Sequence, residues 1–468
     1  MSSAKSYFFS GVGGSGMLPL ALILRGKGET VAGSDRSLDQ GRLGAKFEYL
    51  KAHGIALFPQ DGSGVTSADQ ILVRSAAVED TVGDVVAAKR VGARDMKRPE
   101  LLAELFNSAP VRIGVAGTSG KSTTTGMIAW LLYQAGRNPT VMNGAVMKNF
   151  ATPEALFSSA LVGKGDAFVS EVDESDGSIA RYEPTIAIVN NIALDHKSMD
   201  ELRDLFAGFV NKAEIAVLNM DNDETGALVI RTKVRTRTYA LRSTFADLHC
   251  TDIRLAPDGV AFDVTERDTR ERATVELAVP GEHNVSNALA ALSAARAYGL
   301  SLKDAAEALK GFSGTKRRLE VVGNAAGVIV IDDFAHNPDK ITATLAALHA
   351  FPGRLLIMFQ PHGFGPLRLM RQEFIDTFAT HMGDDDVLIM PDPVYFGGTV
   401  DRSVTSEHIV SGVRARGLQA MAFAERAACG DKLMEIAEPG DRIVVMGARD
   451  DTLSVFAAEL LQRLAQRG

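Results

Sequence analysis

Short apolar runs alternate along the chain with glycine-bearing turns and longer helix-like segments. The first apolar run, 7–10, leads through a turn at 11–16 into an apolar segment at 17–24, and further strands are expected at 30–32 and 70–73. Strands and helices that alternate at this spacing are typical of a parallel sheet covered by helices. The pattern predicts an α/β domain at the start of the chain.

The same order returns after a turn-rich break at 107–110, which follows a predicted helix over 99–106. An apolar run at 111–116 passes through a glycine turn into a predicted helix over 121–135. Further strands of this second region are expected at 167–172 and 185–190.

Between residues 247 and 279 polar and apolar residues alternate strictly in several places. This period of two predicts half-buried strands, as in an antiparallel insertion or a sheet edge. A helix over 284–297 is expected to close the region.

A third stretch begins near residue 315 and repeats the pattern of strands and helices. Its expected strands are 327–331, 354–359, 387–390 and 442–445, and its expected helices are 341–350 and 453–466. We therefore predict three α/β domains, with boundaries at 1–108, 109–313 and 314–468.

Composition narrows the class of protein. A chain of 468 residues is too long for one hydrophobic core, and 46% hydrophobic with 23% charged residues is typical of a globular protein. The net charge of −8 argues against non-specific nucleic-acid binding, which needs a basic surface. No run approaches the roughly 18 apolar residues of a membrane helix, and the first six residues do not resemble a secretory signal. We expect a cytoplasmic protein, a monomer or homodimer, without membrane or nucleic-acid partners.

The clearest chemical motif is a phosphate loop at the start of the helix over 121–135. Glycines let the backbone approach phosphates closely, and the N-terminus of a helix presents unpaired N–H groups to an anion. Lys121 can reach terminal phosphates, and the Ser122 hydroxyl can bind Mg²⁺. The strict pattern has glycine where Val115 stands, so this is a variant of the loop. Its residues are Gly117, Thr118, Ser119, Gly120, Lys121, Ser122 and Thr123.

Candidate metal ligands follow two later strands. Glu171 begins an acidic run that ends at Asp176, and His196 follows the strand at 185–190. Both positions fall at the carboxyl edge of a parallel sheet, where the phosphates would lie. An acidic run also occurs as a solvated loop and an Asp-His pair as a structural feature, so the neighbouring phosphate loop is what favours a metal site.

A second glycine motif lies near the start of the chain. Gly11, Gly13 and Gly16 fit a dinucleotide-binding fingerprint, and Asp35 follows Gly16 at the distance where such a fingerprint has an acidic residue. Taken alone, this segment favours a nicotinamide-dependent dehydrogenase. That interpretation leaves the second phosphate loop unexplained.

Ordered motifs over essentially the whole chain resemble the Mur ligases, the amide ligases that make peptidoglycan precursors. The similar segments are 117–123, 171–176, 191–196, 280–288, 316–318, 332–338 and 360–362. The resemblance implies an N-terminal Rossmann-like domain that binds a UDP-linked substrate, a central P-loop ATPase-like domain and a C-terminal Rossmann-like domain.

Within the family, the N-terminal motif is similar to the branch that joins L-alanine to the carboxylate of UDP-N-acetylmuramate. The resemblance implies that the glycine loop binds the UDP diphosphate and no nicotinamide cofactor. The residues implied for this substrate are Gly13, Gly14, Ser15, Gly16, Met17 and Asp35.

The resemblance also implies an ATP- and Mg²⁺-dependent reaction through an acyl phosphate. Lys121 would bind the transferred phosphate, Ser122 and Glu171 one magnesium ion, and His196 a second metal ion. Asn287, Arg318 and Asp333 would contribute to the ATP site. His336 and His362 would face the incoming amine.

Several positions depart from this branch. Ser119 stands where histidine is common, and Phe334 and Asn337 stand where tyrosine and histidine are usual. Gly363 and Pro366 stand where the branch has arginines, although Arg368 is retained. Loss of two guanidinium groups removes partners for a carboxylate, so we expect the amine preference to differ from L-alanine. The alternatives are a ligase that attaches a recycled peptide to UDP-N-acetylmuramate and a nucleotide-binding paralogue with an altered substrate.

Overall fold

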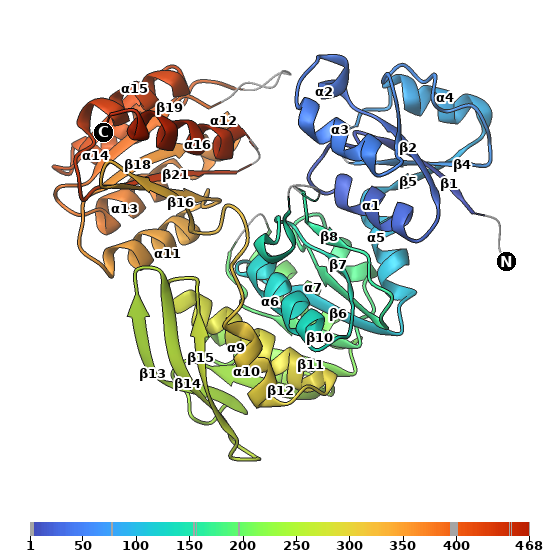
Figure 1. Cartoon of the computed structure of the whole chain (residues 1–468), viewed down its shortest axis with the longest axis horizontal. Coiled ribbons are helices and arrows are strands. Elements are labelled where there is room, and N and C mark those ends of the chain that lie inside the picture. The colour runs from blue at the N-terminus through green and yellow to red at the C-terminus, as the bar shows by residue number, and fades with distance from the viewer. Residues whose placement is uncertain are drawn as a thin grey trace. The chain divides into compact units, whose positions relative to one another are not determined.

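The computed structural model of the chain describes residues 4–75, 78–152, 155, 157–194, 197–393, 401–448, 450 and 452–467. Its contacts divide the chain into two compact units. The first contains residues 1–254, 261–278 and 284–315, and the second contains 255–260, 279–283 and 316–468. Figure 1 labels their helices and strands.

The first unit opens with a five-stranded sheet in the order β3-β2-β1-β4-β5, in which neighbouring strands are parallel. Its strands are β1 (Ser6–Ser10), β2 (Thr30–Ser34), β3 (Ala56–Phe58), β4 (Gln70–Arg74) and β5 (Arg94–Lys97). Its helices are α1 (Leu18–Gly26), α2 (Arg36–Asp39), α3 (Gly44–Ala52), α4 (Gly83–Val91) and α5 (Arg98–Asn107).

Alternation along β1 explains how this sheet is covered on both faces. Tyr7 and Phe9 belong to one hydrophobic cluster with residues of α1, α3 and α5, whereas Phe8 packs with Val85 and Ala88 of α4 on the other face. Successive side chains of a strand point to opposite faces, so the apolar residues 7–9 in the middle of β1 are buried on both sides of the sheet.

A ten-stranded sheet follows, in the order β15-β14-β13-β12-β11-β10-β6-β9-β7-β8. Its strands are β6 (Val111–Ala116), β7 (Thr140–Met142), β8 (Ala160–Leu161), β9 (Ala167–Glu171), β10 (Ile186–Val189), β11 (Ile215–Asn219), β12 (Arg235–Ala240), β13 (Leu248–Ala256), β14 (Gly259–Glu266) and β15 (Arg272–Leu277). The neighbours β13, β14 and β15 are joined by connections so short that they must run antiparallel. Of the two predicted alternatives, an antiparallel insertion or a sheet edge, the structure shows antiparallel strands at the edge of the sheet.

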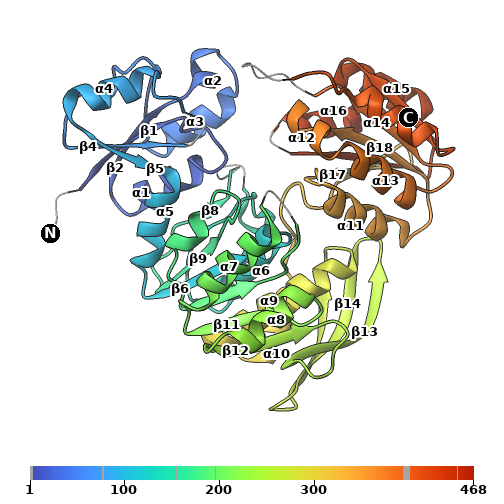
Figure 2. The ribbon, with the colours of Figure 1, turned by 180° about the vertical axis from the view of Figure 1, so that it is seen from behind.

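Helices cover both faces of the ten-stranded sheet, as the two opposite views in Figures 1 and 2 show. They are α6 (Lys121–Gln134), α7 (Met199–Val210), α8 (Asp223–Arg231), α9 (Glu282–Tyr298) and α10 (Leu302–Leu309), with short 3₁₀ turns at Lys148–Phe150 and Ser178–Arg181. Phe106 of α5 packs edge-on against Phe168 and Tyr182, with ring centroids 5.8 and 5.1 Å apart. The two sheets of the first unit therefore share one hydrophobic core.

The second unit contains a six-stranded sheet in the order β16-β17-β21-β18-β19-β20. The strands are β16 (Glu320–Ala325), β17 (Val328–Asp333), β18 (Leu355–Gln360), β19 (Val387–Pro391), β20 (Gln419–Phe423) and β21 (Arg442–Gly447). All neighbours are parallel except β16, which runs antiparallel to β17. The helices are α11 (Pro338–His349), α12 (Phe364–Leu369), α13 (Arg371–His381), α14 (Ser406–Arg414), α15 (Arg426–Ile436) and α16 (Thr452–Ala465).

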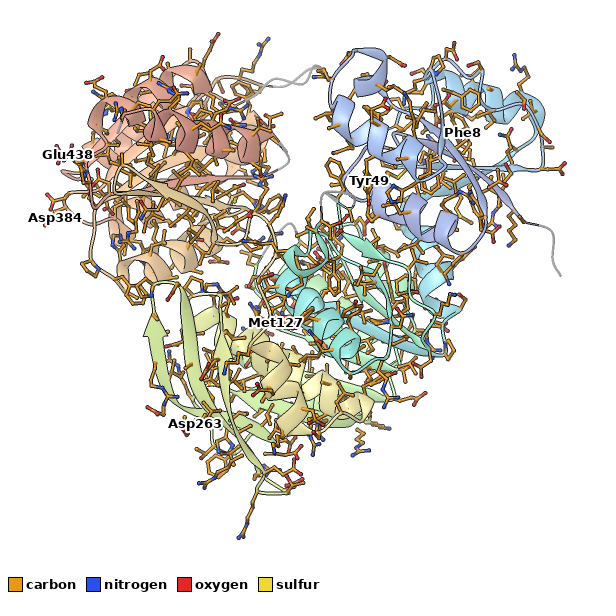
Figure 3. All side chains as sticks on the ribbon, in the orientation of Figure 1. Phe8, Tyr49, Met127, Asp263, Asp384 and Glu438 are labelled. Carbon is orange, nitrogen blue, oxygen red and sulfur yellow. The ribbon has the colours of Figure 1, made fainter. Side chains whose placement is uncertain are left out.

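Two separate hydrophobic clusters cover the faces of this sheet, one with α11, α13 and α14 and the other with α15 and α16. Figure 3 shows Phe8 and Met127 inside the first unit, while Asp263, Asp384 and Glu438 lie at the periphery. Three sheets, each covered by helices, confirm the predicted α/β class. The predicted boundaries at 108/109 and 313/314 stay predictions. In the part of the chain that the structure describes, no helix is long and apolar enough to cross a membrane.

Candidate functional site

The predicted phosphate loop connects β6 to α6, where the sequence placed it. Gly117 has φ of 134° and Gly120 has φ of 79°, a backbone conformation that glycine adopts most readily. A Cβ atom on Gly120 would lie 2.4 Å from Oδ1 of Asn287 and 2.8 Å from Nδ2 of Asn190. Glycine is therefore required here by both backbone conformation and close packing.

Hydrogen bonds to the chain after β10 hold the loop in place. The Thr118 amide donates to the carbonyl of Asn191 at 3.0 Å, and the Ser119 amide donates to the Asn191 side chain at 2.9 Å. The Asn190 side chain donates to Thr124 Oγ1 at 2.9 Å, and that hydroxyl lies 3.3 Å from Oδ1 of Asn287. Asn287, predicted to contribute to the ATP site, thus braces the first turn of α6. Thr123 is buried in the same turn.

Lys121 is held by an acidic partner. Its Nζ donates to Glu174 Oε2 at 2.8 Å and to the carbonyl of Gly117 at 2.7 Å. Burial alone would lower the pKa of Lys121, but the carboxylates of Glu174, Glu171 and Asp173 raise it above its ordinary value. The ammonium group is therefore fully charged at neutral pH, as binding to a phosphate requires.

The acidic run after β9 separates into carboxylates with different environments. Burial raises the pKa of Glu174, although Lys121 opposes this shift. The pKa of Asp173 is lowered, because Lys121 and the Ser175 amide outweigh the effect of burial. Glu171 accepts hydrogen bonds from Ser122 Oγ at 2.7 Å and from the Gly144 amide at 3.0 Å.

Ser122 and Glu171 present the ligand types that Mg²⁺ prefers, one hydroxyl and one carboxylate oxygen already in contact. Among the described residues, no group of three His, Cys, Asp or Glu side chains could hold a metal ion. Mg²⁺ is commonly bound by one or two protein oxygens together with phosphate oxygens and water. The residues therefore fit a magnesium ion that arrives with a nucleotide. His196, the predicted ligand of a second metal, lies outside the described residues.

The N-terminal glycine loop connects β1 to α1, and two charged residues, one directly after β2 and one in α3, fix its shape. The Gly13 amide donates to Asp35 Oδ2 at 2.9 Å, and Asp35 Oδ1 accepts from the Ser37 amide at the start of α2. Lys46 of α3, almost fully buried, donates to the Gly13 carbonyl at 3.1 Å. Asp35 thus shapes the loop. A direct contact of Asp35 with a substrate stays a prediction.

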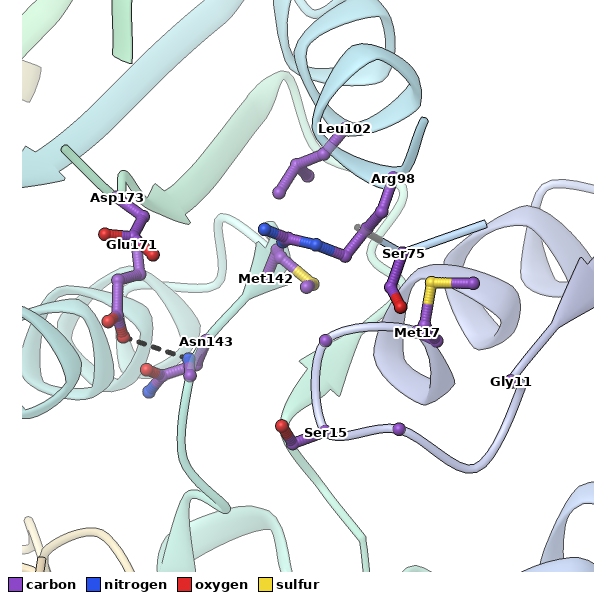
Figure 4. Close-up of a pocket in the computed structure, with 13 residues that line it drawn as sticks. Gly11, Ser15, Met17, Ser75, Arg98, Leu102, Met142, Asn143, Glu171 and Asp173 are labelled. Atoms are coloured by element: carbon purple, nitrogen blue, oxygen red, sulfur yellow. Dashed lines mark hydrogen bonds between the residues drawn. The ribbon is translucent and has the colours of Figure 1, made fainter. Parts of the chain in front are cut away.

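A pocket of about 400 Å³ lies within the first unit. Its lining residues come from the glycine loop, the start of α5, the chain after β7 and the acidic run (Figure 4). They are Gly11, Gly14, Ser15, Gly16, Met17, Ser75, Arg98, Leu102, Met142, Asn143, Gly144, Glu171 and Asp173. Four of the residues predicted for a UDP-linked substrate, Gly14, Ser15, Gly16 and Met17, therefore share a pocket with Glu171.

Two further residues of the pocket lining, Arg98 and Asn143, were not predicted from the sequence. Asn143 donates from Nδ2 to the Ser122 carbonyl at 3.0 Å, and its buried Oδ1 has no hydrogen-bond partner in the structure. Each residue directly follows a strand, β5 or β7, at the carboxyl edge of a parallel sheet. The rule that ligands bind at this edge could have identified both positions, but neither strand was predicted.

The second unit brings together the predicted residues after β17 and β18. The rings of His336 and His362 lie 5.1 Å apart, and His336 also packs edge-on against Phe334 at 5.3 Å. The Arg318 guanidinium lies over the Phe334 ring, 4.4 Å from its centroid. Asp333 is buried and accepts from Thr344 Oγ1 at 2.5 Å and from the Phe334 amide at 2.7 Å.

His336 has the environment of a neutral imidazole. Burial, the nearby Lys340 ammonium, His362 and Arg318 lower the pKa of His336 well below its ordinary value. Its Nδ1 lies 2.8 Å from the carbonyl of Phe334, an acceptor, so Nδ1 carries the proton and Nε2 is left as a proton acceptor.

Comparisons with known proteins agree with this arrangement. Residues 6–109 match the description "Mur ligase family, catalytic domain", residues 115–295 "Mur ligase middle domain", and residues 317–449 "Mur ligase, glutamate ligase domain". The chain is 36% identical over 462 residues to a UDP-N-acetylmuramate–L-alanine ligase of Desulfosudis oleivorans, covering 95% of this chain and 96% of the relative. It is 34% identical over 449 residues to a ligase of the same name from Geotalea uraniireducens, covering 94% of each chain.

Solved structures show the same fold. The UDP-N-acetylmuramate-alanine ligase of Thermotoga maritima superposes with a TM-score of 0.80 at 23% identity, covering 99% of this chain and 100% of that one. A murein peptide ligase of Psychrobacter arcticus superposes with a TM-score of 0.72 at 25% identity, covering 99% of both chains.

Proposed function

Because the chain belongs to the Mur ligase family, we propose that it joins the carboxylate of UDP-N-acetylmuramate to L-alanine or a related amine, with ATP, in peptidoglycan precursor synthesis. One observation carries the proposal. Glu171 binds Ser122 of the phosphate loop and also lines the pocket that the N-terminal glycine loop forms. The Glu171 carboxylate therefore belongs both to the proposed site for a nucleoside triphosphate and to the pocket proposed for the nucleotide-linked acid.

The chemistry requires activation of the carboxylate, because oxide is a poor leaving group. A carboxylate oxygen attacks the γ-phosphorus of ATP and ADP departs, which leaves an acyl phosphate. The amine nitrogen then attacks the acyl carbon, and the tetrahedral intermediate releases inorganic phosphate and a proton. Positioning and charge neutralisation account for most catalysis of phosphoryl transfer.

In this reaction Lys121 gives up its contact with Glu174 and binds the transferred phosphate instead. Ser122 and Glu171 hold Mg²⁺, which neutralises charge on the phosphates when bound. Nε2 of His336, in the second unit, accepts a proton from the amine. Arg318 and Asp333 are proposed ATP-site residues, and Asp333 also fixes the conformation of the chain after β17 through one hydrogen bond to each of its oxygens.

A dehydrogenase would use the N-terminal glycine loop differently, and ligand binding separates the two activities. We expect UDP and UDP-N-acetylmuramate to bind the protein and NAD(H) and NADP(H) to give no signal in calorimetry. Gly13→Val should abolish UDP binding, because a Cβ atom at Gly13 would lie 3.0 Å from Asp35 Oδ2 and 3.1 Å from the Phe47 ring. Tight nicotinamide binding that Gly13→Val abolishes would contradict the ligase assignment.

A peptide is the second candidate for the amine, and the conformation of Gly363 favours it. Gly363 precedes α12 with φ of 150°, which L-amino acids other than glycine rarely adopt, so this turn is not built to carry an arginine. Arg368 pairs with Asp401 at 2.9 Å. A small residue at this turn would leave room for an amine larger than L-alanine.

We expect L-alanine not to be strongly preferred over an L-alanyl-γ-D-glutamyl peptide. Loss of a bidentate cation for an amino-acid carboxylate costs about 2–3 kcal/mol, or roughly 30- to 150-fold in kcat/KM. Phosphate release with UDP-N-acetylmuramate and L-alanine, glycine, L-serine or the peptide measures this, and it also tests the ligase activity itself. A clear preference for L-alanine over all the others would contradict the peptide candidate. Release with none of the amines would contradict the ligase assignment.

A further inference from the structure

The chain that follows β21 carries Asp450 at the carboxyl edge of the six-stranded sheet. We propose that Asp450 and Arg426 are positioning residues that hold the turn carrying His362 against His336. This inference rests on the proposed function, because it concerns the histidines that would meet the amine. It deepens that function by assigning two side chains that were not predicted from the sequence.

The order of the strands determines how the two histidine-bearing turns are related. β21 lies between β17 and β18 and is parallel to both. His336 follows β17 and His362 follows β18, so the strands of the two turns are not direct neighbours. The centroids of the two rings nevertheless lie 5.1 Å apart. Their spacing therefore depends on the chain that follows the intervening strand.

The Asp450 carboxylate fixes the side chain of Gln360, the last residue of β18. Oδ2 of Asp450 accepts from Gln360 Nε2 at 2.9 Å and from Arg426 Nη1 at 2.8 Å. Nη1 of Arg426, the first residue of α15, also donates to Gln360 Oε1 at 3.2 Å, so both polar atoms of the carboxamide have partners. Gln360 is buried and stands two positions before His362. The carboxylate and the guanidinium therefore determine how the chain leaves β18 toward His362.

The backbone of Asp450 contacts the surroundings of the other turn. Its carbonyl accepts from Arg317 at 3.2 Å, and the Arg317 guanidinium lies 5.1 Å from the centroid of the Phe334 ring. The same ring packs edge-on against His336, with centroids 5.3 Å apart. Asp450 thus connects the side chains beside both histidines.

The contacts of Asp450 require a carboxylate. Burial would raise the pKa of this carboxyl group, but hydrogen bonds from Thr452 and Gln360 and the charge of Arg426 lower it below its ordinary value. Oδ1 accepts from the amide and the hydroxyl of Thr452, at 2.9 and 2.5 Å. Each oxygen of Asp450 therefore accepts two hydrogen bonds. Asparagine has one acceptor oxygen and cannot replace both.

The contact between the two imidazoles also affects the basicity of His336. Burial lowers the pKa of His336, and three neighbouring side chains lower it further, those of Lys340, His362 and Arg318. The carbonyl of Phe334, 2.8 Å from Nδ1, raises it. Movement of His362 away from His336 should therefore raise the pKa of His336 toward its ordinary value.

Two readouts test the positioning role, steady-state kinetics and NMR titration of the His336 ring in the whole protein. The chain has nine histidines, and His336→Gln identifies the resonance. For Asp450→Asn we expect kcat/KM for the better of L-alanine and the L-alanyl-γ-D-glutamyl peptide to fall about 10- to 100-fold, because a displacement of about 1 Å can cost about 100-fold. The affinity for UDP-N-acetylmuramate should not change.

The direction of the pKa change separates positioning from simple loss of charge. In Asp450→Asn the pKa of His336 should rise, and the acid limb of the pH dependence of kcat/KM should move to higher pH. Removal of a negative charge without movement of the turn would lower the pKa of an imidazole instead.

Asp441→Asn is the matched control. Asp441 is buried, pairs with Arg354 at 2.6 Å and directly precedes β21, at the opposite edge of the same sheet. Although this variant loses an ion pair, it should keep the amine kinetics and the pKa of His336. Gln360→Leu should show the same loss as Asp450→Asn, and the double variant should be no worse than either, because both act through one contact.

Four results would overturn the inference. They are an unchanged kcat/KM for the amine in Asp450→Asn, an unchanged or lowered pKa of His336 in that variant, equal changes in Asp441→Asn, and losses that add in the double variant. If Asp450→Asn does not fold, Arg426→Gln decides, and parent-like kinetics or pKa there overturns the inference. A parent protein that forms an amide with none of the amines would instead contradict the proposed function, and the titration of His336 would still decide the positioning role.

Discussion

Replacement of Lys121 by alanine is expected to reduce ATP-dependent ligation by at least about 100-fold while UDP-N-acetylmuramate still binds. A positioned cation at a transferring phosphate typically contributes about 3–4 kcal/mol, which corresponds to a factor of about 100 to 1,000 in rate. Lys121 does not line the pocket of the glycine loop, so the affinity for the nucleotide sugar should change little. Phosphate release and calorimetry with UDP-N-acetylmuramate measure the two quantities separately.

The Lys121→Ala variant needs a control for stability, because the substitution removes the partner of the buried Glu174. Loss of Lys121 leaves the Glu174 carboxylate, 5% exposed, without its cation and raises its pKa further. A carboxyl group whose pKa is raised by folding binds more protons in the folded state, so the Lys121→Ala variant should lose stability as pH rises from the ordinary pKa of glutamate to the higher pKa of the folded Glu174 carboxyl. The double variant Lys121→Ala, Glu174→Gln should regain stability and stay inactive.

Lys310→Ala serves as the matched lysine variant, because Lys310 pairs with Glu276 at 3.2 Å on the surface. We expect it to retain full activity. A Lys121→Ala protein that is folded and turns over at more than about a tenth of the parent rate would exclude Lys121 from phosphoryl transfer.

Gly120→Ala should produce a comparable loss of activity through a steric clash, without the removal of any charge. The added Cβ would lie 2.4 Å from Asn287 Oδ1 and 2.8 Å from Asn190 Nδ2, so the phosphate loop must move away from both side chains. A displacement of about 1 Å at a reacting group can cost about 100-fold in rate. We expect that loss in kcat with ATP, measured by phosphate release, and unchanged affinity for UDP-N-acetylmuramate.

Gly136→Ala separates this clash from backbone strain. Gly136 has φ of 70°, close to the 79° of Gly120, but nothing lies within 4 Å of its added Cβ. That variant should lose about 1 kcal/mol of stability and no activity. Similar kinetics for the two variants would show that the contact with Asn287 is unimportant for catalysis.

The elements of the sheets were largely predictable from local sequence, because burial on both faces leaves continuous apolar runs. The strand expected at 111–116 matches β6, and the helix expected at 121–135 matches α6 within one residue. Short strands such as β3, β5 and β7 were missed, since three or four residues do not establish a period. The edge strand β16 was missed as well, because polar and small residues interrupt its short apolar segment.

The sequence by itself determined the two glycine loops, the position of each between a strand and a helix, and the acidic run that accompanies the second loop. These features depend on residues close together in the chain, where backbone conformation and helix geometry act directly. Sequence order could not show which carboxylate of the run faces which partner. Only the tertiary structure decided that Glu171 contacts Ser122 and that Glu174 contacts Lys121.

Only the tertiary structure decided, too, which amides of the N-terminal glycine loop donate to other parts of the chain. Its motif contains seven residues, but five of their amides donate to Ser34 of β2, to Asp35 or to carbonyls within the loop, which leaves the amides of Ser15 and Gly16. Arg98 reaches Gly16 from a helix more than 80 positions later in the chain. Such contacts depend on how strands from distant segments are ordered in one sheet, and that order follows from burial of the whole core rather than from any local pattern.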